Sequence, residues 1–376
     1  MDLKELYERH GQSIWLDFIR RDLLSSGDFA HQVEVDGVRG VTTNPSIFEN
    51  AIDGSDIYRA DLAAYRAGAP AAEVYEHLAV ADIRAAADIL LPLYQRSGGR
   101  DGFVSMEVAP PLARDSQGTV AEGLRLRQTV DRPNLMIKVP ATPEGLPAIR
   151  ALLGRGVNVN VTLLFSRAAC RQVAEAHAVG LEDFAAAGGD PATVASVASL
   201  FVSRLDALLD PQLRAAAEAA PQGKRAGILA LAGQGALANA KLAYQDWKAW
   251  IQGPRWKALA ARGARPQRLL WASTGTKDKT LSDVLYVEGL IGPDTVDTVP
   301  PATLKAFQDH GRAENRLDQD VDGARAILAA IQAAGIDLDA ATDRLLEEGL
   351  ASFGKAFTTL LVSIERQRDA VKGAGR

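Results

Sequence analysis

Short apolar runs alternate with longer segments of helical pattern along most of the chain. Eight of the runs have the length and composition of β-strands: Ser13–Phe18, Val38–Asn44, Phe103–Val108, Leu135–Pro140, Val157–Phe165, Val194–Val202, Arg268–Ser273 and Val296–Pro300. Most are continuously or nearly continuously apolar. That pattern is typical of strands that are buried on both faces of a parallel sheet.

Alanine-rich segments with helical spacing separate most of these runs. They are Ser55–Tyr94, Pro143–Leu153, Ser166–Ala187, Arg204–Ala220 with Gly235–Trp250, and Asp278–Leu285. Three more helical patterns follow the eighth run: Pro301–Gln308, Asp320–Ala334 and the long amphipathic Asp337–Lys372. Strand and helix therefore alternate eight times.

This alternation predicts an α/β protein with a single (β/α)8 TIM barrel, extra helices and one domain over residues 1–376. The last, long helix is expected to fold back over one end of the barrel. The main alternative is a doubly wound open sheet, which shows the same alternation of strands and helices.

Composition and charge narrow the function classes. The hydrophobic fraction is 47%, the charged fraction is 24% and the formal net charge is −5, all ordinary for a globular protein. A mildly acidic chain lacks the excess of basic residues that is typical of nucleic-acid-binding proteins. If the protein binds phosphate, a few placed cations must do so.

Several observations favour a cytoplasmic protein with no membrane partner. The single cysteine, Cys170, excludes an intramolecular disulfide, and the charged segment Met1–Leu6 is unlike a signal peptide. No apolar run approaches the ~20 residues that cross a bilayer. The five histidines are scattered without the spacing of a metal site, so we predict no metal.

Lys138 stands alone as a charge inside the apolar run Leu135–Pro140. On an edge strand its ammonium would reach water, which is the usual position for a lysine. If it is buried, loss of hydration favours the neutral amine, which attacks carbonyl groups and forms Schiff bases. The second interpretation makes Lys138 a candidate nucleophile.

Other polar residues gather where the predicted strands end, which is where barrel enzymes place their catalytic groups. These positions are Asp17, Asn44, Glu107, Asn160, Thr162, Ser199, Arg204, Ser273 and Lys277. In the fifth run, polar and apolar residues alternate, so Asn158, Asn160 and Thr162 share one face. A half-exposed antiparallel strand would also alternate, but asparagine is depleted in strands.

Each of these residues also has a purely structural interpretation. Asp17 could be the N-cap of a helix that starts at Phe18, and Glu107 could face solvent. Arg204 could form a surface ion pair with Asp206 or Asp210 on the helix that follows the sixth strand. Asn44, which precedes a proline, is a common turn residue, and Phe201 would be an ordinary core residue in most proteins.

Taken together, the chain resembles the transaldolase family over nearly its whole length, and its long form more closely. Five segments in order carry the resemblance: Gly40–Phe48 (GVTTNPSIF), Ile137–Thr142 (IKVPAT), Asn158–Ser166 (NVNVTLLFS), Ser199–Arg204 (SLFVSR) and Trp271–Lys277 (WASTGTK). The resemblance implies a class I aldolase-type barrel without a cofactor, acting on sugar phosphates. The resemblance does not fix the oligomeric state, and both a monomer and a homodimer are compatible with it.

The resemblance also implies a catalytic role for four residues. Lys138 would attack the ketone of fructose 6-phosphate or sedoheptulose 7-phosphate and form a Schiff base. Asp17 would take the proton from the hydroxyl group on the carbon being released. Glu107 and Thr162 would hold a water molecule and move protons while the carbinolamine forms and dehydrates.

The remaining implied roles concern binding. By the same resemblance, Asn44, Asn160 and Ser199 would hydrogen-bond the three-carbon unit, and Phe201 would form a wall beside the Schiff base. Arg204, Ser273 and Lys277 would hold the substrate phosphate. The chain departs from the family pattern at Gly275, where shorter members carry an arginine, and Lys277 is the nearest cation.

Three alternative functions were weighed against transfer of a dihydroxyacetone unit. A fructose 6-phosphate aldolase would cleave without transfer, but such enzymes lack the glutamate on the third strand. Gly233–Ala238 fits a loose dinucleotide fingerprint, yet it follows a poor strand and has no acidic partner downstream. A non-catalytic sugar-phosphate binder on the same barrel would not need a buried lysine.

Overall fold

The computed structural model describes residues 1–53, 55–65 and 68–373. Within them, the strands are β1 (Ser13–Leu16), β2 (Gly40–Val41), β3 (Phe103–Glu107), β4 (Leu135–Pro140), β5 (Val159–Leu164), β6 (Ser196–Phe201), β7 (Arg268–Ala272) and β8 (Val296–Val299). They pair in parallel in chain order, and β8 pairs with β1 to close the barrel. The eight predicted strands are confirmed, and the open doubly wound sheet was wrong.

The helices surround this barrel. They are α1 (Leu3–His10), α2 (Arg21–Ser25), α3 (Asp28–His31), α4 (Pro45–Ile52), α5 (Arg59–Ala64), α6 (Ala71–Arg96), α7 (Ser116–Val130), α8 (Gly145–Leu153), α9 (Arg167–Ala186), α10 (Ser203–Ala219), α11 (Gln222–Leu229), α12 (Gly235–Ile251), α13 (Pro254–Ala260), α14 (Leu285–Gly289), α15 (Pro301–His310), α16 (Val321–Ala333) and α17 (Leu338–Gly373). Short 3-10 or π turns include η2 (Asp56–Tyr58) and η3 (Pro110–Arg114).

The strands are apolar because both of their faces are covered. Nearly every residue of the eight strands is buried, either inside the barrel or under the helices. Trp15 of β1 and Trp271 of β7 are both fully buried and are among the largest core side chains. Burial on both faces gives parallel strands their continuous apolar character.

Two predicted helices differ in the structure. The segment predicted as Ser55–Tyr94 divides into η2, α5 and α6, and residues 66–67 within it lie outside the described residues. The predicted helix Asp278–Leu285 was wrong, because the segment is a loop and α14 begins only at its last residue. The Asp278 side chain accepts hydrogen bonds from the backbone N–H and hydroxyl of Thr280, and such local bonds compete with a helix.

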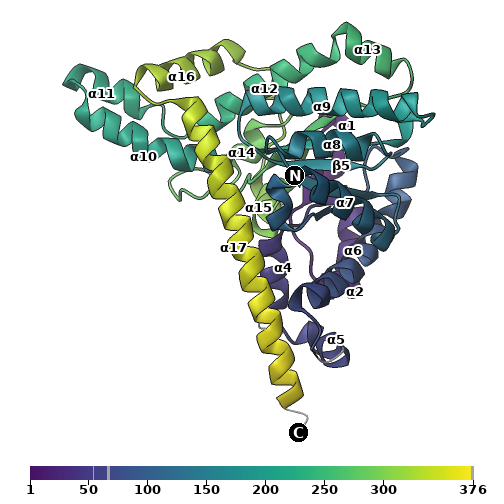
Figure 1. Cartoon of the computed structure of the whole chain (residues 1–376). Coiled ribbons are helices and arrows are strands. Elements are labelled where there is room, and N and C mark those ends of the chain that lie inside the picture. The colour runs from purple at the N-terminus through teal and green to yellow at the C-terminus, as the bar shows by residue number, and fades with distance from the viewer. Residues whose placement is uncertain (54, 66–67, 374–376) are drawn as a thin grey trace.

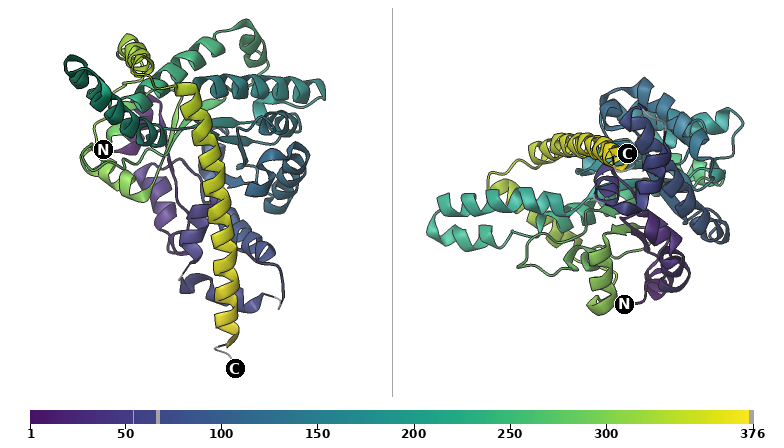
Figure 2. Two further views of the ribbon diagram at one scale, coloured as in Figure 1. Left: turned by 60° about the vertical axis from the view of Figure 1, so that its left-hand side comes forward. Right: turned by 90° about the horizontal axis from the view of Figure 1, so that it is seen from below.

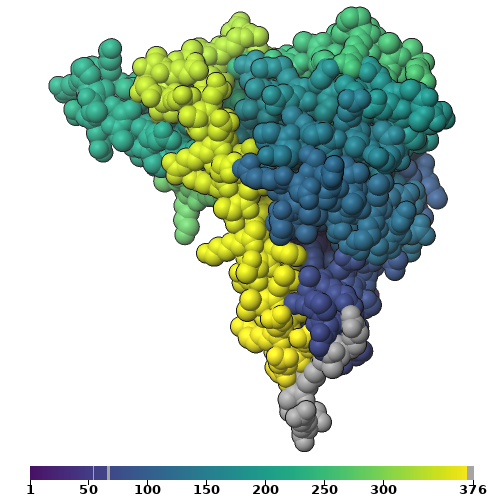
Figure 3. Space-filling model, viewed as in Figure 1, coloured from purple at the N-terminus to yellow at the C-terminus, as the bar shows by residue number. Residues whose placement is uncertain are grey.

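The predicted long C-terminal helix is confirmed as α17. It packs on α4, α5, α6, α10, η3 and β5, so it crosses the end of the barrel at which the strands finish. Figures 1 and 2 show it running along the body of the molecule. In Figure 3 its outer face lies on the surface beside the segment that contains α7. No helix in the described part of the chain is both long and apolar enough to cross a membrane.

Candidate active site

A cavity of about 350 Å³ opens at the C-terminal ends of the barrel strands. Its lining residues are Asp17, Thr42, Asn44, Lys138, Thr162, Ser199, Phe201, Arg204, Ala272, Ser273, Gly275, Thr276, Lys277, Thr298, Pro300 and Phe353. Two cavities of about 430 Å³ are larger, but they lie between the outer helices, beside α9 and α12. The charged and polar residues of the cavity at the strand ends, and not its size, identify it as the candidate active site. We call it the barrel cavity.

Lys138 lies inside the barrel and is only 5% exposed. Its Nζ donates a hydrogen bond to the backbone carbonyl of Thr43 at 3.0 Å and lies 3.7 Å from Oε2 of Glu107. Phe353 of α17 places its ring centroid 5.7 Å from the same nitrogen. The solvated interpretation of this lysine was therefore wrong, because the strand belongs to a closed barrel and has no free edge.

Glu107 ends β3, and its side chain is 8% exposed. Burial raises the pKa of this carboxyl group to about 7, although the charge of Lys138 opposes the shift. Its Oε2 and the hydroxyl of Thr162 are buried atoms without a hydrogen-bond partner among the described residues. Buried polar atoms are rarely left without a protein partner, so both groups are suited to bind a water or a substrate.

Asp17 follows β1, and its backbone N–H donates to the carbonyl of Val299 at 2.8 Å. Its Oδ1 accepts a hydrogen bond from the hydroxyl of Thr42 at 2.7 Å. Burial raises the pKa of this carboxyl group, while Lys138, the Thr42 hydroxyl and Arg204 lower it. Asp17 does not cap a helix, since α2 begins later, at Arg21.

Asn160 lies inside the barrel, directly below the residues that line the barrel cavity. Its side chain is fully buried, donates to Ser105 Oγ at 3.0 Å and accepts from Ser199 Oγ at 2.7 Å. Ser199 lines the cavity and Asn160 does not, so the asparagine positions the serine in this structure. Asn158 lies at the opposite end of the barrel, where it donates to the backbone carbonyl of Leu135 at the start of β4 and accepts from the backbone N–H of Ala195 before β6, and it takes no part in the site.

Asn44 combines the two interpretations that the sequence offered. Its side-chain oxygen accepts a hydrogen bond from the backbone N–H of Ile47 at 3.0 Å, which makes it the N-cap of α4. The same residue lines the cavity. Because the N-cap interaction fixes the side chain, the amide group is held at the cavity wall.

Two cations at the mouth have no counter-ion. Neither Arg204 nor Lys277 forms an ion pair among the described residues, and burial lowers the pKa of both. The charge of Arg204 lowers the pKa of Lys277 further, so the two cations repel each other. Arg204 is partly buried and Lys277 is exposed, and both line the barrel cavity. Cations that face one cavity without an ion pair to a described residue are suited to bind an anion such as a phosphate.

The alternative ion pair of Arg204 was wrong. Asp206 instead accepts hydrogen bonds from the backbone N–H of Ala236 and the hydroxyl of Tyr286. The guanidinium group of Arg204 lies over the ring of Phe201, 5.1 Å from its centroid, and Phe201 forms part of the cavity wall.

Ser273 directly follows β7 and has a left-handed backbone conformation, φ 57°. Its hydroxyl lies 3.0 Å from that of Ser203, and the side chain lines the cavity. At Gly275 an added Cβ would lie 3.2 Å from the Thr303 hydroxyl, tighter than most such contacts. A side chain at this position would therefore be crowded. The cations at this side of the cavity are Arg204 and Lys277, and Lys277 lies two residues after Gly275 in the loop.

Three residues of the site were not predicted from the sequence. Thr42 bridges Asp17 and Thr298, whose hydroxyl lies 2.6 Å from its own. The sequence of β8 could have indicated Thr298. Alternate residues of a strand point to the same face, so Thr298 lies on the face of Val296, near the end of the strand. Phe353 belongs to a helix far along the chain, and no local signal connects it with the barrel.

The dinucleotide interpretation of Gly233–Ala238 was wrong. The segment follows α11 and opens α12, so no strand precedes it, and the N–H of Gly233 donates to Asp210. Among residues 1–53, 55–65 and 68–373, no group of three or more His, Cys, Asp or Glu side chains is arranged to hold a metal ion.

Comparisons with known proteins agree on one family. The family model described as transaldolase/fructose-6-phosphate aldolase matches residues 14–364. A curated protein of Thiobacillus denitrificans named transaldolase is 50% identical over 370 residues, which cover 97% of this chain and 100% of that protein. A transaldolase of Trichodesmium erythraeum is 44% identical, with 96% of each chain covered. Transaldolase 2 of Nostoc punctiforme is 47% identical, with 95% of each covered.

Proposed function

Because the chain belongs to the transaldolase/fructose-6-phosphate aldolase family, we propose that it is a transaldolase that forms a Schiff base on Lys138. The reaction transfers a dihydroxyacetone unit from a ketose phosphate to an aldose phosphate. Sedoheptulose 7-phosphate and glyceraldehyde 3-phosphate would yield erythrose 4-phosphate and fructose 6-phosphate. The observation that carries the proposal is the buried pair of Lys138 and Glu107 beneath two unpaired cations.

The first stage forms the imine. Glu107 lies close enough to receive a proton from Lys138, which leaves a neutral amine to attack the ketone carbon. The carbinolamine then loses its hydroxyl group as water, and the protonated Glu107 supplies the proton. A carboxyl group with a pKa of about 7 is suited to both steps, because near neutral pH it both takes up and releases a proton.

The second stage breaks and re-forms a carbon–carbon bond. The iminium group withdraws electrons from the bond between the third and fourth carbons of the sugar. Asp17 removes the proton of the hydroxyl group on the fourth carbon, the aldose leaves, and an enamine remains on Lys138. A second aldose then adds to the enamine, and Asp17 returns the proton to the new hydroxyl group.

Binding groups keep the substrate and the enamine in place. Arg204, Lys277 and Ser273 hold the phosphate at the mouth, and the guanidinium group can donate two parallel hydrogen bonds. Asn44 and Ser199 bind hydroxyl groups of the three-carbon unit, with Asn160 fixing Ser199 from below. Thr162 and Glu107 hold the water of the imine steps.

Transfer without release is what separates this function from that of a fructose 6-phosphate aldolase, the second candidate. The three relatives described above are named transaldolases, which supports transfer. We place the reaction in the non-oxidative pentose phosphate pathway, in the cytoplasm, with residues 1–376 acting as one domain. Sugar phosphates are the expected partners, and no cofactor is needed.

Borohydride trapping tests the proposal directly. The protein is incubated with fructose 6-phosphate and reduced, and the modified peptide is mapped by mass spectrometry. A reduced three-carbon adduct on Lys138 is expected. If folded protein carries no adduct on any lysine, the Schiff-base function is wrong and a binding role remains. Added erythrose 4-phosphate should give sedoheptulose 7-phosphate, whereas an aldolase would release dihydroxyacetone.

A further inference from the structure

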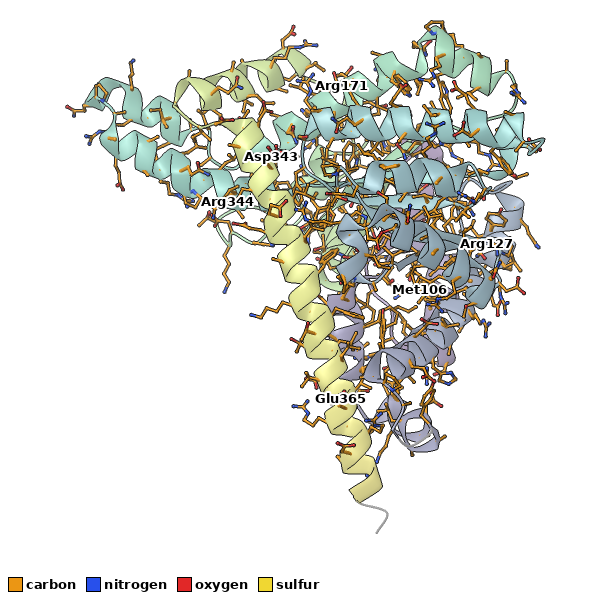
Figure 4. The ribbon with its side chains drawn as sticks, in the orientation of Figure 1. Met106, Arg127, Arg171, Asp343, Arg344 and Glu365 are labelled. Carbon is orange, nitrogen blue, oxygen red and sulfur yellow. The ribbon has the colours of Figure 1, made fainter. Side chains whose placement is uncertain are left out.

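A second, smaller cavity lies behind Glu107. It has a volume of about 120 Å³ and is lined by Pro45, Ala72, Tyr75, Glu76, Met106, Glu107, Val108, Ala109, Pro110, Glu122, Leu126 and Phe357. We call it the rear cavity. Figure 4 labels Met106, in the body of the molecule between α17 and Arg127 of α7. Of the residues assigned to catalysis, only Glu107 lines the rear cavity, and Glu107 does not line the barrel cavity.

Two aromatic residues of α17 separate the cavities. Phe353 lines the barrel cavity, and Phe357, about one helical turn later on the same side of α17, lines the rear cavity. The Phe357 ring meets the ring of Tyr75 edge-on at 5.6 Å between centroids, and Tyr75 meets Phe48 at the same distance. These contacts pack Phe357 and Tyr75, both of the rear cavity, on the side of α17 that also carries Phe353.

The rear cavity opens on the surface between α6 and α7. Ala72 on its rim is exposed, and the side chains of Glu76 and Glu122 are 30% and 21% exposed. Arg125 forms ion pairs with both glutamates, so the rim has an excess of one negative charge. Such a rim repels the phosphate of a substrate and admits water.

Glu107 lines the rear cavity and lies beside Lys138, which lines the barrel cavity. Its Oε2 has no hydrogen-bond partner in the described part of the chain and lies 3.7 Å from Lys138 Nζ. On the other side, burial raises the pKa of Tyr75, another residue of the rear cavity, and the charge of Glu107 raises it further. The carboxyl group is therefore in electrostatic reach of both the nucleophile and the rear cavity.

We propose that the rear cavity is the route by which water and protons reach Glu107 while the sugar fills the barrel cavity. The inference rests on the proposed function. Dehydration of the carbinolamine breaks a carbon–oxygen bond, and the hydroxyl group takes the proton of Glu107 and leaves as one water molecule. Hydrolysis of the imine later consumes one water molecule at the same carbon, and Glu107 accepts its proton.

A sugar bound in the barrel cavity stands between that carbon and the mouth during both steps. A route through the mouth would require the sugar to move aside while it is still bound to Lys138 as the carbinolamine or the imine. The rear cavity has room for several water molecules, since one needs only about 10–15 Å³ of such space. It delivers water to Glu107 and keeps bulk solvent away from the enamine.

The test blocks the rear cavity without touching the barrel cavity. Ala72→Phe covers the rim, and Leu126→Phe fills the interior. Ala81→Phe is the matched control, because Ala81 is also an exposed alanine of α6 but lines neither cavity. Each protein is incubated with fructose 6-phosphate in heavy-oxygen water. Exchange of the ketone oxygen reports imine formation and hydrolysis, and thermal unfolding reports the fold.

Both blocking variants should exchange the ketone oxygen several-fold more slowly than Ala81→Phe, with an unchanged KM for fructose 6-phosphate. Exchange as fast as in Ala81→Phe for both would overturn the route. A raised KM with normal exchange at saturation would likewise overturn it, because the rear cavity would then affect sugar binding. The wild-type borohydride adduct separates the two proposals: its absence overturns the Schiff base itself, whereas an adduct with unslowed exchange overturns only the route.

Discussion

Glu107 and Lys138 are register partners on the adjacent parallel strands β3 and β4, and their charged atoms lie 3.7 Å apart. Both side chains are more than nine-tenths buried. Burial favours a neutral Glu107 and the lysine favours its carboxylate. The pKa of Glu107 therefore depends on both its burial and the charge of Lys138.

Replacing Lys138 by alanine should abolish both transfer and borohydride trapping while the barrel remains folded. The nucleophile is lost, and no other lysine lines the cavity except Lys277 at its mouth. Transfer from fructose 6-phosphate to erythrose 4-phosphate and the mass of the reduced protein are the measurements. Full activity in this variant would rule out the Schiff-base mechanism, and a matched Lys277→Ala variant should still form the adduct.

Glu107→Gln should slow imine formation about 10²- to 10⁴-fold, the range typical of a lost general acid–base group. Glutamine keeps the size of the side chain but does not exchange protons. In the wild type, the rate should change with pH around the Glu107 pKa of about 7. Single-turnover trapping across this pH range should show an inflection that is missing from the variant. An unchanged single-turnover rate would assign proton transfer to another group.

Arg204→Ala should raise the KM for fructose 6-phosphate by about 10- to 100-fold, as expected for the loss of a hydrogen bond to a charged group. Free dihydroxyacetone has no phosphate, so its KM should change much less. Steady-state kinetics with both donors provide the comparison, and Lys277→Ala should show the same selectivity to a smaller extent. Equal effects on both donors would place Arg204 outside the phosphate site.

Asp297→Asn should make stability less dependent on pH. Asp297 is fully buried, accepts one hydrogen bond from Thr274 at 2.9 Å and has no partner for Oδ2 among the described residues. Burial raises its pKa from 3.8 to about 8. Between these values the unfolded chain loses this proton and the folded chain keeps it. The free energy of unfolding therefore falls as the pH rises, by at most about 1.4 kcal/mol per pH unit.

Asparagine imitates the protonated acid, so it should remove this slope and stabilise the protein near neutral pH. Denaturant unfolding at several values between pH 5 and pH 8 measures the effect; this is the window below the Asp297 pKa of about 8. Asp322→Asn is the control, because that side chain is 97% exposed. Parallel pH profiles for wild type and Asp297→Asn would mean that Asp297 is ionised in the folded protein.

The sequence by itself determined the barrel, most of the secondary structure and most of the candidate site. Apolar runs separated by helical patterns reflect how each segment is buried, and burial periodicity is a local property of the chain. The helix predicted over Asp278–Leu285 was wrong because side-chain hydrogen bonds of the loop, such as those of Asp278, outweigh its helical pattern. The alternation of the fifth run placed Thr162 on a polar face, but only the resemblance supplied its role.

Only the tertiary structure decided which of these side chains meet. It placed Asn160 beneath the cavity, left Arg204 and Lys277 without an ion pair to any described residue, and brought the ring centroid of Phe353 of α17 to 5.7 Å from Lys138 Nζ. It also created the rear cavity, whose walls come from β3, α4, α6, α7 and α17. These contacts join residues that are far apart in the chain. They depend on how finished elements pack against one another, and no local pattern of hydrophobic and polar residues records that packing.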